Sequence, residues 1–230
     1  MRDPERRAEA PRRAAERFTA WLESDRFTCL GALAALHRGE LVVRDYGRLT
    51  GETEVRALHA DLTAFVERRL APGTDPGFHS FAALFAASTV RDEAEFERVL
   101  WGLLQALHER DRTRHEYAPD VSSDPGSPSF GFSVAGHPFF VVGLHPGATR
   151  ISRRSPIPTV VFNSHRQFAR LKESGVYQGL RTRIRAREVR LQGSVNPMLA
   201  EHGERSEAPQ YSGRFQSPHW SCPFRPHAED

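Results

Sequence analysis

The sequence has few cysteines, a single lysine and no long apolar run. Cys29 and Cys222 are the only cysteines among 230 residues, too few for the disulfide scaffold of a small secreted protein. A cytosolic chain more often keeps such thiols free or bound to a metal. No apolar stretch approaches the roughly 20 residues that span a bilayer. The charged N-terminus also lacks the apolar segment of a secretory signal. We therefore expect a cytoplasmic protein without a membrane partner.

A large excess of charge of one sign is also missing. The chain has 32 basic and 29 acidic residues and a formal net charge of +3. So small an excess does not favour binding to a polyanion, and we expect no nucleic-acid partner. Arginine provides almost all of the positive charge, because lysine occurs only at Lys172.

The signatures of several common enzyme classes do not occur. The sequence contains no GxGxxG after a strand, no GxxxxGK[ST] phosphate loop and no GxSxG nucleophile turn. It also lacks a CxxC pair, an HExxH motif and the Glu-x-x-His spacing of di-iron carboxylate proteins. These absences argue against dinucleotide, nucleoside-triphosphate, serine-hydrolase, structural-zinc and di-iron chemistry.

Hydrophobic spacing predicts a mixed fold. Residues 1–12 are charged and contain two prolines, so we expect a flexible segment, with helical spacing beginning near Pro11. From residue 192 to the end the chain is polar and rich in proline and glycine, yet it carries several aromatic residues. We expect one α+β domain over residues 13–230, with a small, mostly antiparallel sheet flanked by helices and a long irregular segment over 192–230. The remaining predicted helices cover 29–36, 52–70, 92–109, 164–173 and 177–188, and the predicted strands cover 40–46, 78–88, 130–134, 139–144 and 159–162.

The second half of the chain contains five distinctive blocks: HPFFVVGLHPGATRISRR (137–154), PTVVFNSHRQFARL (158–171), LQGSVNPML (191–199), SEAPQYSGR (206–214) and WSCPF (220–224). Together they resemble the YqcI/YcgG-like family. A shorter N-terminal string, FTCLGA, resembles the Phe-Pro-Cys block of that family, with Thr28 in place of the usual proline. The five blocks occur in the family's order and cover most of the last ninety or so residues.

The resemblance implies a cofactor and a reaction. Characterised members of the family are haem b enzymes that use dioxygen to hydroxylate a guanidine or amine nitrogen of an amino acid, as in D-cycloserine biosynthesis. The resemblance therefore implies haem b, an external electron donor and an amino-acid or guanidine substrate. It also implies a role in specialised-metabolite biosynthesis. Two alternatives stay open: a haem-binding protein without oxygenase activity, and a cofactor-free module that binds an anionic partner. A homodimer also stays open.

An oxygen-activating haem needs one axial ligand from the protein. Cys29 is the first candidate, because it lies at the expected N-terminus of a helix, where amides and the helix dipole favour a thiolate. A thiolate ligand also favours O–O cleavage. Cys222 is the rival, since the indole of nearby Trp220 can donate to a thiolate. For either cysteine, the alternative is a small buried side chain.

Two histidines inside the blocks are further candidates. His145 ends a predicted strand, and its imidazole can ligate iron or help to protonate bound oxygen, so we predict a catalytic role. His165 lies at a predicted helix start and is expected to contact the cofactor. For His145 the alternative is a structural histidine, and at His165 it is an ordinary helix start capped by Ser164 or Asn163.

Arginines and a polar group complete the predicted site. Arg150, Arg153 and Arg154 follow the strand that ends at His145, and guanidinium groups suit carboxylates. We expect them to hold haem propionates or a substrate carboxylate, unless they form a solvated surface. A cationic guanidine needs a carboxylate, for which Glu207 is the best candidate and Glu204 the alternative. The predicted substrate contacts are Asn196, Glu207, Tyr211 and Arg214, and Trp220 is expected to wall the cofactor pocket.

Overall fold

A five-stranded sheet forms the centre of the computed structural model, which describes residues 4–71, 73, 77–173, 175–198 and 204–226. The strand order is β1-β2-β5-β4-β3, in which β1 and β2 run parallel and every other neighbouring pair is antiparallel. The predicted α+β class with a mostly antiparallel sheet is therefore confirmed. The strands are β1 (Leu41–Asp45), β2 (Ser80–Leu84), β3 (Phe132–Val134), β4 (His137–Leu144) and β5 (Thr159–Ser164).

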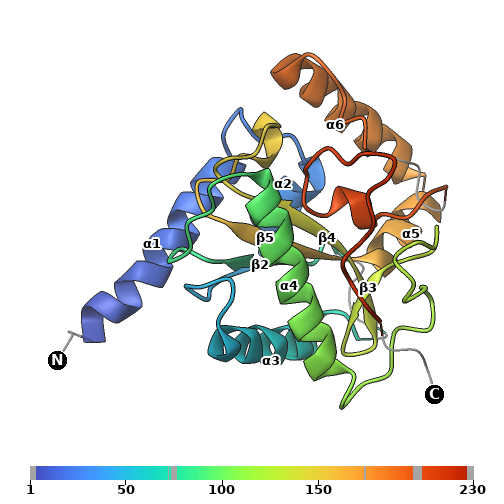
Figure 1. The fold of residues 1–230 in the computed structure, drawn as a ribbon. Helices are drawn as coiled ribbons and strands as arrows, with labels where there is room; N and C mark the ends of the chain where they lie inside the picture. The colour runs from blue at the N-terminus through green and yellow to red at the C-terminus, as the bar shows by residue number, and fades with distance from the viewer. Residues whose placement is uncertain (1–3, 72, 74–76, 174, 199–203, 227–230) are drawn as a thin grey trace.

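Helices cover both faces of this sheet (Figure 1). Among the described residues, no helix has the length and apolar character needed to cross a membrane. The α-helices are α1 (Pro4–Leu22), α2 (Leu30–His37), α3 (Glu52–Arg69), α4 (Glu93–Asp111), α5 (His165–Glu173) and α6 (Val176–Gln192), and the short 3₁₀ helices are η1 (Ile151–Arg153) and η2 (Ala208–Gln210).

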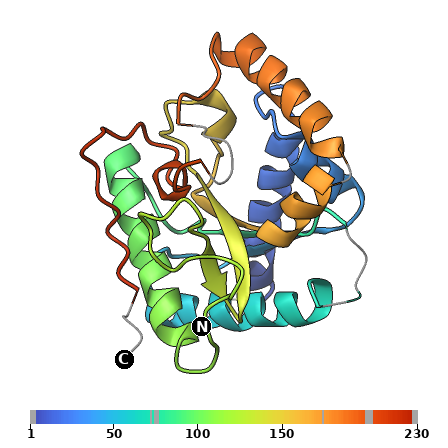
Figure 2. The ribbon, with the colours of Figure 1, turned by 90° about the vertical axis from the view of Figure 1, so that its right-hand side faces the viewer.

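The two faces of the sheet bury separate apolar clusters, because side chains alternate along each strand. In β2, Phe81 and Ala83 pack into a cluster with α3 and α4, whereas Ala82 and Leu84 join a cluster with α1. Figure 2 shows the sheet between α4 on one side and α1 and α2 on the other. Because both faces are covered, all five residues of β2 (SFAAL) are buried.

The start of the first helix differs from the prediction. The structure has α1 from Pro4, with Pro11 inside the helix, whereas hydrophobic spacing placed the start near Pro11. Proline removes one backbone hydrogen bond of a helix interior, but an i,i+4 ion pair between Arg13 and Glu9 spans this position. Residues 4–12 are therefore helical, where we expected a flexible segment, and residues 1–3 lie outside the described part.

The irregular C-terminal segment covers an open edge of the sheet. Strand β3 pairs with β4 only from His137 to Phe139, so the rest of β4 has an unpaired edge there. The Gly143 amide donates to the Tyr211 carbonyl at 2.7 Å. A Cβ at Gly143 would lie 2.5 Å from the Phe96 ring and 2.9 Å from that carbonyl, so the close approach requires glycine. The predicted irregular segment is thus packed, and it protects an edge strand.

Candidate functional site

A cavity of about 290 Å³ lies on the same face of the sheet as α1 and α2. The sheet contributes Ser80, Phe140 and Asn163, which alternate with residues of the opposite cluster. Cys29 and α2 line another part of the cavity, and α5, α6 and residues of the C-terminal segment such as Glu207 line much of the rest. The volume is close to the lower end of the range of about 300–1,000 Å³ for small-molecule pockets. It suits a ligand of amino-acid size.

Cys29 lies where the sequence placed it, directly before α2, and its side chain lines the cavity. The amides of Gly31 and Ala32 act to lower the pKa of the thiol, as expected at a helix N-terminus. Burial outweighs them, however, and raises the pKa of Cys29. The protonated thiol is therefore favoured, although the positive charge of Arg153 also acts to lower this pKa.

Glu207 faces the cavity and connects two other predicted residues. The Nε2 of His165 lies 2.8 Å from Oε1 of Glu207, and both residues line the cavity. The Tyr211 hydroxyl, which is fully buried behind them, donates to the same carboxylate oxygen. Burial raises the pKa of Glu207, while the hydrogen bonds from His165 and Tyr211 oppose that rise. The arrangement holds a buried carboxylate that can accept a proton or bind a cation.

The remaining lining is apolar with cationic side chains. Gln167 carries a buried Oε1 that has no hydrogen-bond partner among the described residues. The sequence did not reveal the cavity-lining residues of α5 and α6. A usable signal exists in α6, because Tyr177, Leu180, Arg181 and Ile184 have the i, i+3, i+4, i+7 spacing of one helix face. The apolar members are Phe78, Phe140, Phe168, Leu180 and Ile184, and the cationic members are Lys172, Arg181, Arg185 and Arg205.

His145, predicted to be catalytic, does not line this cavity. Its ring stacks on Phe96 of α4 with centroids 4.4 Å apart, and α4 packs on the opposite face of the sheet. The side chain is buried, and neither ring nitrogen has a hydrogen-bond partner among the described residues. Burial lowers the pKa of His145 to about 4, so the imidazole is neutral near pH 7. The structure therefore separates His145 from Cys29.

The three predicted anion-binding arginines bind backbone carbonyl groups instead. Arg153 donates to the carbonyls of Gly143 (3.0 Å), Gln210 (3.1 Å) and Tyr211 (3.3 Å), and burial lowers its pKa to about 10. Arg154 donates to the carbonyls of Ala148 and Thr149. Arg150 donates to the carbonyl of Ser194 at 2.7 Å and also forms an ion pair with Glu188 at 3.7 Å. These arginines hold η1 and the C-terminal segment in place. None of them is among the described residues that line the cavity.

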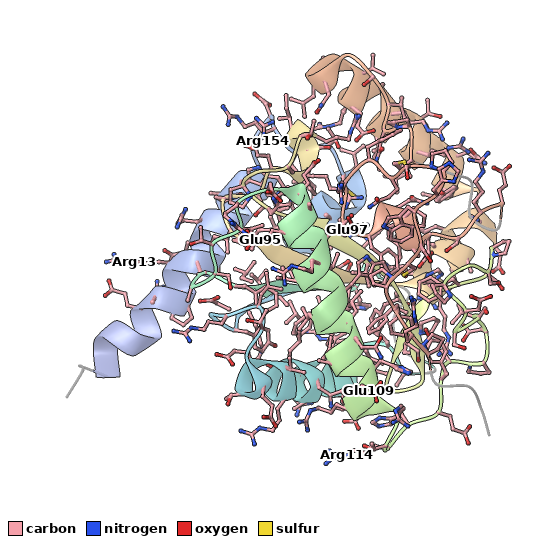
Figure 3. The ribbon with its side chains drawn as sticks, viewed as in Figure 1. Arg13, Glu95, Glu97, Glu109, Arg114 and Arg154 are labelled. Carbon is pink, nitrogen blue, oxygen red and sulfur yellow. The ribbon has the colours of Figure 1, made fainter. Side chains whose placement is uncertain are left out.

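Two of the four predicted substrate residues also lie elsewhere. The backbone N–H of Asn196 donates to the carboxylate of Glu188 at 3.3 Å, and the guanidinium group of Arg214 donates to Glu97 of α4 at 2.7 Å. Figure 3 labels Glu97 on the side of α4 that faces the C-terminal segment. Neither Asn196 nor Arg214 lines the cavity. The predicted substrate contacts are therefore reduced to Glu207, with Tyr211 behind it.

Cys222 and Trp220 line a second cavity of about 990 Å³. Loop residues 121–126 complete much of that lining. Burial raises the pKa of Cys222 to about 12, which disfavours a thiolate. The two thiols thus lie in different cavities, so the choice between them is also a choice between two sites. Cys29 shares its cavity with His165 and Glu207, and Cys222 does not.

Comparisons with known proteins give one match. The model of the YqcI/YcgG family matches residues 18–225, which include every residue that lines the Cys29 cavity. No curated protein and no solved structure matches the chain.

Proposed function

Because the chain belongs to the YqcI/YcgG family, we propose that it is a cytoplasmic, haem-dependent monooxygenase. It hydroxylates a nitrogen of L-arginine or of a related guanidine or amine amino acid with dioxygen and an external electron donor. One observation carries the proposal. A single apolar cavity is lined by a thiol at a helix N-terminus, a buried carboxylate paired with an imidazole, and four cationic side chains.

The residue types of the lining, rather than its present volume of about 290 Å³, match the chemistry of haem b. Cys29 offers a soft sulfur ligand, and the positive iron supplies the partner that favours its thiolate. Apolar side chains such as Phe78 and Phe168 suit a porphyrin, and cations such as Arg205 suit its propionates. When bound, the haem supplies dioxygen activation, and a thiolate ligand favours O–O cleavage. Arg150, Arg153 and Arg154 hold neither propionate nor substrate in this proposal, because backbone carbonyls and, for Arg150, the carboxylate of Glu188 already bind them.

Glu207 and Gln167 account for binding of a cationic substrate. A guanidinium group donates several N–H bonds in one plane, and carboxylate oxygens are strong acceptors for them. Oε1 of Glu207 already accepts from His165 and Tyr211, so Oε2 is the atom that accepts an N–H of the guanidinium group. The unpartnered Oε1 of Gln167 accepts a further N–H. The positive charge of the substrate offsets the burial that raises the pKa of Glu207. His165 keeps the carboxylate in place through its contact of 2.8 Å with Oε1.

The four cations also favour a second candidate function. Lys172, Arg181, Arg185 and Arg205 outnumber Glu207 around the cavity, as expected for a module that binds a small anion without a cofactor. In that case the protein is colourless after expression with sufficient haem, and it binds anions more tightly than arginine.

The absorption spectrum of the reduced, CO-bound protein tests the first proposal. We expect a Soret band of the thiolate type that Cys29→Ser abolishes or shifts, since a hydroxyl is a poor ligand for the iron. Cys222→Ser is the matched control and should leave the band unchanged. An imidazole-type band would contradict ligation by Cys29, and the absence of any haem signal would contradict the whole mechanism.

A further inference from the structure

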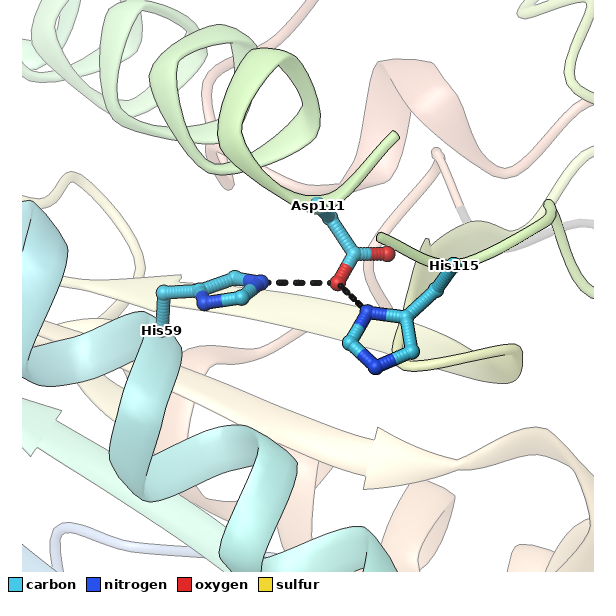
Figure 4. A group of neighbouring side chains, drawn as sticks. All are labelled: His59, Asp111 and His115. Carbon is cyan, nitrogen blue, oxygen red and sulfur yellow. Dashed lines mark hydrogen bonds and ion pairs between the residues drawn. The ribbon is translucent and has the colours of Figure 1, made fainter. Parts of the chain in front are cut away.

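We propose that His59, Asp111 and His115 form a binding site for a divalent transition-metal ion such as Zn²⁺. Figure 4 shows the three side chains facing one another. His59 comes from α3, Asp111 is the last residue of α4, and His115 follows in the next loop. One ligand atom from each residue lies within 4.8 Å of the other two. The site shares no residue with the Cys29 cavity.

The donor atoms converge on one point. The Nε2 of His59 lies 2.7 Å from Oδ1 of Asp111, and the Nδ1 of His115 lies 3.0 Å from the same oxygen. Two imidazoles and one carboxylate form the ligand set of many catalytic zinc sites and of non-haem iron sites. Such sites leave a position open for water or another ligand.

The charge balance favours a cation at this point. The side chain of Asp111 is only 5% exposed, and its ion-pair partners among the described residues are the two histidines alone. No arginine or lysine of the described part compensates it. A buried carboxylate costs free energy unless a positive charge pairs with it. A divalent ion bound between the three side chains supplies such a positive charge.

The surroundings hold the carboxylate and leave a route for entry. The Ala135 amide lies 3.0 Å from each oxygen of Asp111 and orients the group, as outer-shell donors do in metal sites. The His115 side chain is 30% exposed, so the site reaches solvent on that side. Glu109 and Arg114, which flank the cluster in sequence, lie at the end of α4 remote from Arg154 (Figure 3). None of the three proposed ligands lines the Cys29 cavity, so the metal site and the proposed haem site are built from different residues.

Zinc is the probe, because haem iron does not interfere with its measurement. The full-length protein with Cys29→Ser and Cys222→Ser is stripped with a chelator and titrated with Zn²⁺ by calorimetry, since free thiols also bind zinc. We expect one zinc ion per chain and a rise in Tm with zinc concentration, because a ligand that binds only the folded state stabilises it.

Three variants in that background separate a metal site from a hydrogen-bonded cluster. His115→Ala, at the partly exposed position, should weaken zinc binding by more than the roughly 10–100-fold loss typical of an outer-shell change. Asp111→Asn should do the same, and His37→Ala, at an exposed histidine, should have no effect. The Tm without zinc reports folding of each variant separately. The proposal fails if the parent protein binds no stoichiometric zinc, or if folded His115→Ala protein binds it as tightly as the parent.

Discussion

At the scale of single residues, the ionisation of Glu207 depends on its immediate neighbours. Burial raises the pKa of the carboxyl group, and His165 and Tyr211 lower it through hydrogen bonds to the same oxygen. A cationic ligand in the cavity shifts this balance further toward the carboxylate. The substrate and the proton therefore compete for the same group.

Replacing Glu207 with Gln tests this competition. Gln keeps the size of the side chain but removes its charge, and a hydrogen bond to a charged group contributes about 1.5–3 kcal/mol. We expect L-arginine to bind roughly 10–100-fold more weakly, as measured by calorimetry. In the wild type, binding should weaken as the pH falls through the raised pKa of Glu207, and this dependence should disappear in the variant.

The control for this prediction is Glu204→Gln. Glu204 is exposed, does not line the cavity, and was the alternative carboxylate in the sequence analysis. Its replacement should leave arginine binding unchanged. If Glu204→Gln weakens binding and Glu207→Gln does not, the substrate does not bind to Glu207.

At the scale of elements, local spacing and long-range pairing differ in what they allow us to predict. The helix predicted over 52–70 spans Glu52–Arg69 in the structure, because its buried positions repeat every three to four residues. The parallel pairing of β1 with β2 was not predictable, since no local pattern encodes the partner of a strand. The same holds for the site. Cys29 and Glu207 were identified singly, but only the packing of α2, α5 and η2 around the sheet brings them to one cavity.

The arginines were assigned to the site from the sequence, but the structure places their side chains elsewhere. Arg153 has the residue type and position of an anion-binding group, yet its donors are directed at carbonyls of β4 and of the C-terminal segment. A sequence shows where a guanidinium group is, but it does not show which acceptors surround that group. A carbonyl on the open edge of β4 is such an acceptor. The sequence did not predict this open edge, because it exists only where the three-residue strand β3 does not pair with β4.

We predict that Arg153→Met loosens the C-terminal segment. The change keeps most of the aliphatic length but leaves three carbonyl groups without this donor, which should lower the free energy of unfolding by about 2–4 kcal/mol. Urea denaturation measures the loss, and limited proteolysis should show earlier cleavage between residues 204 and 216. Arg154→Met is the matched control. Arg154 binds only carbonyls of its own loop, Ala148 and Thr149. Equal losses in both variants would contradict this role.

At the scale of the whole molecule, the sheet separates the main apolar core from the face that carries the candidate site. The face that carries α3 and α4 is a continuous apolar core, and the other face combines a smaller apolar cluster with the Cys29 cavity. The C-terminal segment connects the two faces, because Tyr211 stacks on Trp101 of α4 while it hydrogen-bonds to Glu207 at the cavity. Ligand binding is therefore expected to stabilise the fold as a unit.

Buried neutral histidines should make the stability of this fold depend on acid pH. Burial lowers the pKa of His145 to about 4 and that of His137 to about 3, both below the value of about 6.5 in an unfolded chain. Between these values only the unfolded state takes up the proton. Stability is therefore complete above about pH 6.5 and falls as the pH decreases toward 4.

His145→Phe isolates the part of this loss that arises at one residue. Phenylalanine keeps the stack on Phe96 and leaves no buried ring nitrogen without a partner. We expect the variant to be at least as stable as the wild type at pH 7 and to lose on the order of 2 kcal/mol less between pH 6.5 and 4. Urea denaturation at a series of pH values measures both curves. Parallel stability curves of variant and wild type would mean that His145 is protonated equally in the folded and the unfolded state. If the variant loses activity but keeps the acid-dependent loss of stability, the catalytic role predicted for His145 from the sequence would be supported instead.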